Sequence, residues 1–293
     1  MNIKMLATDM DGTLLKNNKT LSIQNIKALR KAYNSGIEIV ICTGRPFATI
    51  KPYLSQIGLP CWVVSNNGAV IRNKEEKLIE VININNDSLL HLIPILEKEN
   101  IYYHGSDGTC SYIKSYRERI KVIKNFIMLK QQSKLKLWLN ILSAVFLSGA
   151  HKKVDIMKYI SEGGTFASLF IYSLDEEKLM VIKEKIKCIK GIELTSSGRD
   201  NIEVLHQTAS KGSALRRLCD ELNINSDEVI AVGDNFNDLS MLSFAGVGVA
   251  MENAEEEVLK VADWKTKSNE EDGISFLIET LLHNRDALYK GAE

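Results

Sequence analysis

Short apolar runs and segments of helical spacing alternate at the start of the chain. Met5–Asp9 is an apolar run that ends in an acid, and Ile23–Ala32 carries apolar residues at helical spacing. A β-branched run follows at Ile37–Cys42, and the proline of Thr43–Pro46 suits the first turn of a second helix. Strands that are apolar throughout are typical of a parallel sheet with helices on both faces. The pattern therefore predicts an α/β fold.

The chain changes character after a hairpin. The turn signal Asn67-Gly68, between the apolar runs Trp62–Ser65 and Ala69–Arg72, predicts this hairpin. From about Ile84 to Ser197, expected helices mix with short strands. The helices are Ser88–Glu99, Arg117–Lys130 and Asp175–Lys190, and the strands are Ile101–His104, Cys110–Ile113 and Phe166–Tyr172. This mixture is typical of a separate α+β domain.

The alternation of strand and helix returns after this interval. The expected elements are the helix Leu215–Leu222, the strand Val229–Val232, the helix Leu239–Phe244 and the strand Val247–Ala250. We therefore expect a discontinuous core domain of residues 1–83 and 198–293, interrupted by an inserted domain of residues 84–197.

Length, charge and cysteine usage narrow the class of protein. The chain has 293 residues, which corresponds to about two domains at roughly 150 residues each. Its 37 lysine and arginine residues balance 37 aspartate and glutamate residues, so no net charge favours nucleic acid or a membrane as a partner. The five cysteines include no C-x-x-C pair, and no secretory signal precedes Asp9, so we expect a cytoplasmic protein.

One apolar segment, Leu135–Ala150, raises the question whether the chain enters a membrane. It is interrupted by Lys136 and Asn140, and it is shorter than the roughly 18 to 20 apolar residues that a spanning helix needs. A buried or interface-facing helix is one interpretation of this segment, and a lid or dimer surface is the other.

Two carboxylates, Asp9 and Asp11, follow the first apolar strand and precede Gly12. In an open parallel sheet, ligands bind at the carboxyl ends of the strands, where these acids are expected. The strand period points both side chains the same way, and Gly12 allows the backbone to turn and to present a carbonyl group. Two packed acids repel each other, and a divalent cation with hard oxygen ligands relieves that repulsion. An exposed acidic turn is the alternative.

Three later segments are expected at the same edge of the sheet. They bring Thr43 after its strand, Lys211 at the start of a helix, and Asp234 with Asp238 after a further strand. A hydroxyl and an ammonium group are suitable donors to a phosphoryl group, and carboxylates suit a nucleophile, an acid/base and metal ligands. Taken singly, Thr43 can be a helix cap, Lys211 a surface lysine and Asn235–Asp238 a turn.

The order of these residues resembles that of the haloacid dehalogenase superfamily of phosphohydrolases. Its four motifs are matched here by DMDGTLL, ICTGR, ASKGSAL and GDNFNDLSML, which lie in the two outer parts of the chain. The resemblance implies a Rossmann-like parallel-sheet core with helices on both faces and an inserted α+β cap domain. The cap enters between the second and third motifs, because a helix and a strand already fill the interval between the first two.

The resemblance also implies catalytic and metal-binding roles. Asp9 is expected to attack phosphorus and to form an aspartyl-phosphate. Asp11 is expected to protonate the leaving oxygen and then to activate the hydrolytic water. Mg²⁺ is expected to bind the Asp9 carboxylate, the Asp11 backbone carbonyl and Asp234.

Other residues of the motifs are expected to hold the phosphoryl group. The resemblance assigns its oxygens to Thr43 with the adjacent Gly44, to Lys211 and to Asn237. Asp238 is expected to orient Lys211 or a metal-bound water. An anionic nucleophile is repelled by an anionic phosphate unless Mg²⁺ and Lys211 neutralise charge in the transition state.

The layout resembles the Cof-type group of sugar-phosphate and related phosphatases, through Asn66–Ala69 and Asp272–Ile274. Arg45 and Asn67 are candidate substrate contacts on the core side, with helix capping and turn formation as the alternatives. Substrate choice is expected to lie in the cap, because the cap closes over the leaving group. Its aromatic candidates, for which packing is the alternative, are Tyr102, Tyr103, His104 and Tyr112.

We therefore predict a cytoplasmic, Mg²⁺-dependent phosphoric monoester hydrolase that acts on a small phosphorylated metabolite, with a sugar phosphate as the leading class. One alternative is a phosphomutase of the same superfamily, which uses Asp9 and Asp11 but returns the phosphoryl group to a second hydroxyl. Another is a non-catalytic ligand-binding or regulatory protein, since fold alone does not establish function. A homodimer through the cap is a further expectation, and it rests on the apolar segment.

Overall fold

A computed structural model of the chain describes residues 2–128 and 151–283. The apolar segment Leu135–Ala150 lies outside the described residues, and so does the dimer surface expected on it. None of the helices found in residues 2–128 and 151–283 has both the length and the apolar character needed to cross a bilayer.

The chain divides into two compact units. The first is drawn from Met1–Gly44, Lys51–Val81 and Ala209–Glu293, and the second from Arg45–Ile50 and Ile82–Thr208. The second unit ends later than the boundary expected at residue 197. The cause is the strand β11 (Asn201–His206), which pairs with β9 (Ser168–Tyr172) and so continues the sheet of the second unit.

The first unit contains an eight-stranded sheet in the order β14-β13-β12-β1-β2-β3-β4-β5. The strands are β1 (Met5–Thr8), β2 (Glu38–Cys42), β3 (Trp62–Ser65), β4 (Val70–Arg72), β5 (Leu78–Val81), β12 (Val229–Gly233), β13 (Val247–Ala250) and β14 (Trp264–Lys265). From β14 to β3 every pair is parallel, and Ala7 of β1 lies opposite Ala231 and Val40. The predicted hairpin adds β4, and then β5, as antiparallel strands.

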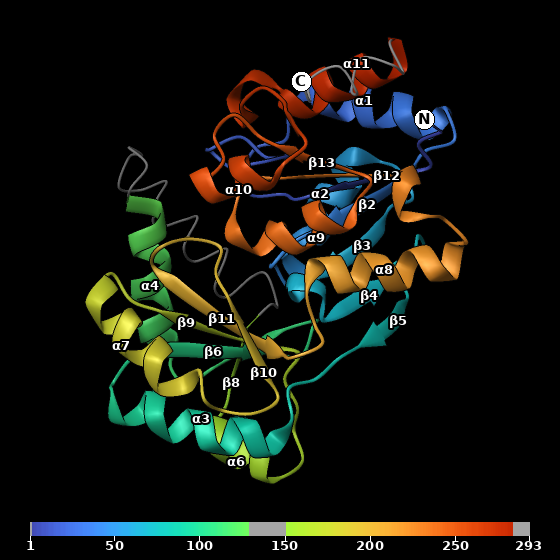
Figure 1. The fold of residues 1–293 in the computed structure, drawn as a ribbon. Coiled ribbons are helices and arrows are strands. Elements are labelled where there is room, and N and C mark those ends of the chain that lie inside the picture. Colours follow the sequence, from blue (N-terminus) through green and yellow to red (C-terminus); the bar gives the residue numbers. More distant parts are fainter. Residues whose placement is uncertain (1, 129–150, 284–293) are drawn as a thin grey trace. The chain divides into compact units, whose positions relative to one another are not determined.

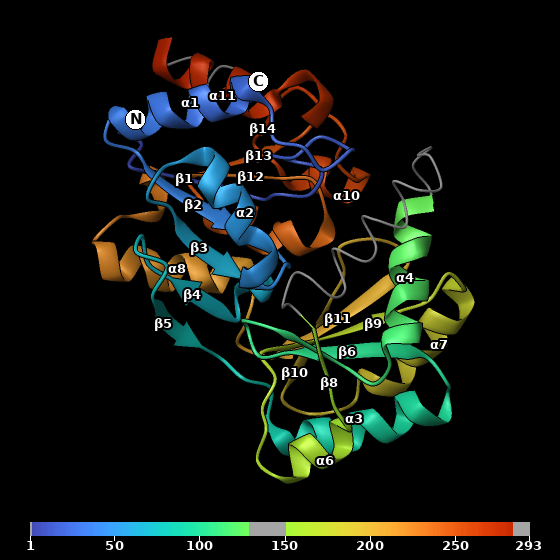
Figure 2. The same cartoon turned by 180° about the vertical axis from the view of Figure 1, so that it is seen from behind.

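Helices cover both faces of this sheet. They are α1 (Ile23–Asn34), α2 (Phe47–Ile57), α8 (Lys211–Leu222), α9 (Leu239–Phe244), α10 (Glu256–Val261) and α11 (Gly273–His283). Figures 1 and 2 show α1 beside α11 on one face, and α8 with α9 on the other. Because strand side chains alternate, Met5 and Ala7 pack in the core with α8 and α9, while Leu6 is buried on the opposite side. Burial on both faces explains why these strands are apolar throughout.

Short 3₁₀ helices and capping residues shape the loops of the first unit. The 3₁₀ helices are η1 (Asn66–Gly68), η3 (Ser226–Glu228), η4 (Phe236–Asp238) and η5 (Asn269–Glu271). At the start of α8, the Ser210 side chain accepts a hydrogen bond from the Ser213 backbone N–H, and the Ser213 side chain accepts one from the Ser210 backbone. This reciprocal cap defines Lys211 as the first residue of α8.

The second unit contains a six-stranded mixed sheet in the order β10-β11-β9-β6-β7-β8. Besides β9 and β11, its strands are β6 (Tyr102–Ser106), β7 (Ser111–Ile113), β8 (His151–Lys153) and β10 (Ile192–Thr195), and its helices are α3 (Asn86–Lys98), α4 (Tyr116–Met128), α6 (Ile156–Ser161) and α7 (Glu176–Ile186). All strand pairs are antiparallel except β7 with β8. The structure confirms the predicted fold class, an α/β core with a second, inserted sheet.

The aromatic residues expected to shape the cap surface divide between two environments. Tyr103 and Tyr112 belong to the hydrophobic core that α3, α6 and α7 form with the sheet. This packing favours the structural alternative for both. The centroid of the His104 ring instead lies 5.1 Å from the centroid of the Phe170 ring and 5.8 Å from that of the Tyr102 ring.

Candidate active site

Three residues predicted from the sequence follow directly on the carboxyl ends of parallel strands. Asp9 follows β1, Thr43 follows β2 and Asp234 follows β12. The Asp9 backbone N–H donates to the Val232 carbonyl at 2.9 Å, and the Thr43 N–H donates to the Val64 carbonyl at 2.8 Å. These bonds extend the sheet ladder by one residue. They place the first residue after each strand at one edge of the sheet.

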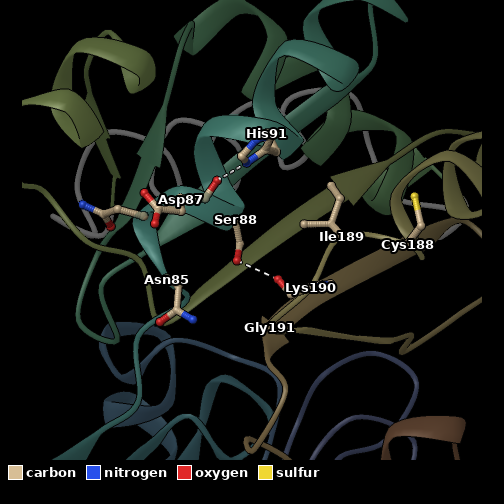
Figure 3. Close-up of a pocket in the computed structure, with 9 residues that line it drawn as sticks. Asn85, Asp87, Ser88, His91, Cys188, Ile189, Lys190 and Gly191 are labelled. Carbon is tan, nitrogen blue, oxygen red and sulfur yellow. Dashed lines mark hydrogen bonds between the residues drawn. The ribbon is translucent and has the colours of Figure 1, made fainter.

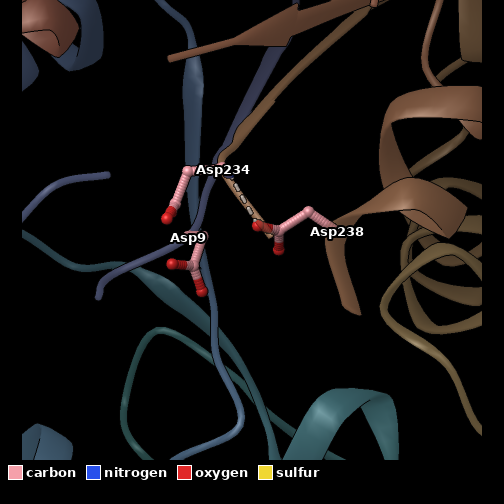
Figure 4. Close-up of side chains that lie close together, drawn as sticks. All are labelled: Asp9, Asp234 and Asp238. Carbon is pink, nitrogen blue, oxygen red and sulfur yellow. Dashed lines mark hydrogen bonds between the residues drawn. The ribbon is translucent and has the colours of Figure 1, made fainter. Parts of the chain in front are cut away.

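Three buried carboxylates meet at this edge. Asp9, Asp234 and Asp238 each offer one oxygen, and these three oxygens all lie within 4.8 Å of one another (Figure 4). Among the residues that the structure describes, these acids form the one group of three acidic, histidine or cysteine side chains close enough to hold a metal ion. The cluster therefore joins the first and last motifs of the chain.

Lys211 connects two of these acids. Its Nζ donates to Asp9 Oδ1 and to Asp238 Oδ1, each at 2.6 Å, and its side chain is fully buried. Burial by itself lowers the pKa of Lys211, but Asp238 and Asp9 outweigh burial and raise that pKa above its ordinary value. The ammonium group of Lys211 therefore stays charged.

Asp238 has both carboxylate oxygens in hydrogen bonds. Its Oδ1 accepts from Lys211, and its Oδ2 accepts from the backbone N–H groups of Asp234 at 2.9 Å and Asn235 at 3.0 Å. Gly233 makes this turn possible, because a Cβ there would lie 2.4 Å from the Asp238 Cβ. These contacts fit a residue that orients Lys211 and the chain after β12.

The carboxylates carry more charge than Lys211 neutralises. Burial raises the pKa of Asp9 to about 7, against the opposing effect of Lys211 and with a further contribution from Asp238. Burial, with Asp9 and Asp238, also raises the pKa of Asp234 well above its ordinary value. Oxygen-rich sites of excess negative charge fit a hard divalent cation, which holds such carboxylates ionised. The cluster is therefore consistent with a metal site.

Asp11 lies outside the carboxylate cluster. Its side chain is 34% exposed and pairs with Lys19, whose Nζ lies 2.5 Å from Asp11 Oδ1. Lys19 has a left-handed backbone, with φ of 63°, and its carbonyl accepts a hydrogen bond from the Tyr53 hydroxyl at 3.1 Å. Sequence reasoning missed Lys19, because a lysine in a polar turn carries no pattern that separates it from other surface lysines.

Asn67 and Asn237 form a buried amide pair next to Thr43. Asn237 Nδ2 donates to Asn67 Oδ1 at 3.0 Å, and the Asn67 backbone N–H donates to the Thr43 carbonyl at 3.0 Å. Gly68 packs its backbone against the start of α8, since a Cβ there would lie 2.0 Å from the Ser210 carbonyl oxygen. The hairpin turn is thereby attached to the strand end that carries Thr43 and to the helix that carries Lys211.

The remaining two candidates, Gly44 and Arg45, adjoin Thr43 in the chain. Gly44 belongs to the first unit, whereas Arg45 falls among residues 45–50, which group with the second unit. The structure therefore brings Asp9, Lys211, Asp234 and Asp238 together.

The second unit holds a different candidate, a surface cavity of about 750 Å³ (Figure 3). It is lined by Asn85, Asn86, Asp87, Ser88, His91, Cys188, Ile189, Lys190 and Gly191. Two of its polar side chains already form hydrogen bonds with the backbone. His91 Nδ1 donates to the Asp87 carbonyl at 2.7 Å, and Ser88 Oγ donates to the Lys190 carbonyl at 2.8 Å. The carboxylate cluster is therefore the stronger candidate for chemistry.

Comparisons with known proteins agree with this assignment. A model of the haloacid dehalogenase-like hydrolase family matches residues 6–278. Phosphatase YwpJ of Bacillus subtilis is 33% identical over 285 residues, which cover 96% of this chain and 100% of YwpJ. The 5-amino-6-(5-phospho-D-ribitylamino)uracil phosphatase YwtE of the same bacterium is 31% identical over 290 residues, covering 97% and 100%. A solved haloacid dehalogenase-like hydrolase from B. subtilis matches with a TM-score of 0.84 and 33% identity, over 95% of this chain and 100% of that one.

An acid and lysine cluster at the edge of a mostly parallel sheet, with a second sheet inserted in the chain, defines the class of haloacid dehalogenase-type phosphatases. The chain belongs to the haloacid dehalogenase-like hydrolase family, within its Cof-type group. It is a phosphoric monoester hydrolase that acts on small phosphomonoesters. This finding confirms the resemblance of the four motifs and the prediction of an enzyme.

Gly12→Ala is expected to lower phosphatase activity at least about tenfold while the protein still folds. Gly12 has φ of 86°, and a Cβ there would lie 2.2 Å from Asp234 Oδ2, so the side chain of Asp234 must move. Gly36→Ala is the matched control, because Gly36 has φ of 84° and nothing within 4 Å of its Cβ position. Both variants are expected to unfold at a lower temperature, since alanine is strained at positive φ by about 1 kcal/mol or more. Phosphate release and thermal unfolding measure the two effects, and equal activity in both variants would contradict the prediction.

Proposed function

We propose that the chain is a Mg²⁺-dependent phosphatase that hydrolyses a sugar phosphate or a related ester through an aspartyl-phosphate on Asp9. The observation that carries this proposal is the buried Lys211 ammonium, which lies 2.6 Å from Asp9 Oδ1 beside the Asp234 carboxylate. A fully buried lysine held against a candidate nucleophile supplies positive charge where the anionic phosphoryl group must approach.

The chemical steps follow from the two motif acids. A carboxylate oxygen of Asp9 attacks phosphorus, and the bond from phosphorus to the leaving oxygen breaks. Asp11 gives its proton to that leaving oxygen. In the second step Asp11 takes a proton from water, which attacks phosphorus and releases Asp9 with inorganic phosphate. The partial exposure of Asp11, at 34%, suits a group that must exchange a proton in each half of the reaction.

Residues around the cluster would hold the metal and the phosphoryl oxygens. The Asp9 carboxylate, the Asp234 carboxylate and the Asp11 backbone carbonyl would hold Mg²⁺. When bound, Mg²⁺ supplies positive charge to the phosphoryl group and to the attacking oxygen. The Thr43 hydroxyl, with the adjacent Gly44, and the Asn237 amide would donate to phosphoryl oxygens, and Asn67 supports Asn237 at 3.0 Å.

A sugar phosphate is the leading substrate class. YwtE, 31% identical to this chain, is named as a phosphatase of a phosphoribitylamino-uracil, which is a phosphorylated sugar-alcohol derivative. We infer a small phosphorylated metabolite rather than nucleic acid or a membrane as the partner, because the 37 basic and 37 acidic residues balance. The five cysteines are all free, which supports a cytoplasmic location. Arg45 stays a candidate substrate contact, and a homodimer stays a prediction.

The test is phosphate release from a panel of sugar phosphates, nucleotides, flavin mononucleotide and pyridoxal phosphate, with Mg²⁺ or with EDTA. We expect release from at least one sugar phosphate to fall by at least about a hundredfold in EDTA and to return with added Mg²⁺. Equal release in EDTA would overturn the metal-dependent mechanism. Interconversion of sugar phosphates without net phosphate release would identify a phosphomutase instead.

A further inference from the structure

We propose that the side chains of Asn25, Asn253 and Asn269 form an amide clamp that positions the loop carrying Asp9 and Asp11 for divalent-cation binding. The cation part of this inference rests on the proposed function. Asn25 is far in the sequence from Asn253 and Asn269, and none of the three belongs to the four motifs. They are positioning residues, because each acts through the backbone of the loop.

The loop after β1 has few backbone hydrogen bonds of its own. Between residues 9 and 22 the chain forms no helix or strand apart from isolated bridges, Asp11 with Leu15 and Leu15 with Leu21. Within the loop, the Leu15 N–H donates to the Met10 carbonyl at 2.8 Å, the Lys16 N–H donates to the Thr20 carbonyl at 3.0 Å, and the Lys19 N–H donates to the Lys16 carbonyl at 2.8 Å. None of these bonds uses the carbonyl of residue 12, 14 or 15. A loop outside any sheet ladder needs other donors for its carbonyl groups. Side-chain amides supply them here.

Each clamp asparagine donates to a different carbonyl of this loop. Asn253 Nδ2 donates to the Gly12 carbonyl at 2.8 Å. Asn25 Nδ2 donates to the Leu14 carbonyl at 3.2 Å, and Asn269 Nδ2 donates to the Leu15 carbonyl at 2.9 Å. Three of the four carbonyls from residue 12 to residue 15 are therefore held by amide side chains.

The clamp is anchored in the C-terminal part of the first unit. Asn25 Oδ1 accepts from the Ser275 backbone N–H at 3.0 Å, and Asn253 Oδ1 accepts from the Asn269 backbone N–H at 2.9 Å. Asn25 is fully buried and Asn269 is 2% exposed, so water does not replace these bonds readily. The loop is thus tied to η5 and to the first turn of α11.

The clamp reaches the cation site through Gly12 and Thr13. Gly12, at φ of 86°, has no Cβ to restrict rotation of its peptide groups, so the bond from Asn253 supplies that restriction. The next residue, Thr13, donates from Oγ1 to Asp234 Oδ1 at 2.6 Å. Loss of the bond to Gly12 therefore loosens the spacing between Asp9, the Asp11 carbonyl and Asp234, on which cation affinity depends.

The test replaces the exposed clamp residue, since its removal leaves the buried core intact. In Asn253→Ala, Mg²⁺ affinity measured by titration calorimetry is expected to fall about tenfold. Hydrogen exchange of the amides of residues 11–15 is expected to accelerate. Asn73→Ala is the matched control, because Asn73 Oδ1 caps an exposed turn by accepting from Glu75 and Lys77. It is expected to change neither quantity.

The result that overturns the clamp is exchange in residues 11–15 of Asn253→Ala that equals the exchange in wild type. Faster exchange with Mg²⁺ affinity within twofold of wild type overturns its link to the cation. Asn269→Ala tests a second arm of the clamp by the same two measurements. A wild-type protein that neither binds Mg²⁺ nor releases phosphate refutes the proposed function, whereas the exchange comparison decides the clamp in either case.

Discussion

Asp9→Asn is expected to lower the rate of phosphate release by roughly 10⁴-fold or more, because an amide is a poor nucleophile of nearly the same size. Asn keeps an oxygen that can accept from Lys211 Nζ, which lies 2.6 Å from Asp9 Oδ1, so the arrangement of the site should persist. Thermal unfolding and phosphate release at saturating substrate measure the two expectations. Asp87→Asn, at an exposed position in the first turn of α3, is the matched control and should keep wild-type activity.

The raised pKa of Asp9 adds a stability test to the same variant. Its ordinary value is 3.8 and its value in the fold is about 7, so the folded, metal-free state binds a proton that the unfolded state has lost. The stability contribution of Asp9 is therefore complete below pH 3.8 and is lost as pH rises through about 7. Metal-free wild type should lose stability relative to Asp9→Asn across this range. Near-full activity of Asp9→Asn would overturn the nucleophile assignment.

Lys211→Met is expected to lower phosphate release by about 10³-fold and also to destabilise the fold by about 3–5 kcal/mol. The catalytic loss follows from removal of the positive charge beside Asp9. The loss of stability has a different cause, because Asp9 and Asp238 then remain buried without their shared cation. Lys4→Met is the control, since Lys4 pairs with Glu228 at the surface and its loss should change stability far less than the loss of Lys211.

A double variant separates these two effects of Lys211. Lys211→Met with Asp238→Asn removes one of the two stranded carboxylates, and it should recover part of the lost unfolding free energy. Activity should not recover, because the positive charge near the phosphoryl group is still missing. Denaturant unfolding and phosphate release on the single and double variants measure this. Recovery of activity together with stability would show that Lys211 acts on the fold alone.

The core strands, and their location in the two outer parts of the chain, were predictable from local patterns. Apolar runs at β1, β2, β3, β12 and β13 identify buried parallel strands, because strands covered on both faces carry no polar alternation. The edge strands β5 and β14 were missed. Their burial is partial, and β14 has two residues, so neither leaves a clear apolar run. The sequence also did not predict that the second unit extends to Thr208. The reason is related, because its strand β11 carries Asn201 and Glu203 among apolar residues and so gives no clear apolar run.

The sequence by itself determined which residues follow the carboxyl ends of the core strands, and therefore that Asp9, Thr43 and Asp234 share one edge of the sheet. Strand periodicity and the parallel arrangement are local properties, so a linear pattern is sufficient to predict them. The tertiary structure alone decided the charge balance of the site and the support of its loops. Lys211 is fully buried because α8 packs against the sheet, and the Asn269 amide meets the Leu15 carbonyl across 254 positions in the chain. Burial and hydrogen-bond partners depend on such distant segments, because desolvation and directional bonds arise when packed surfaces meet.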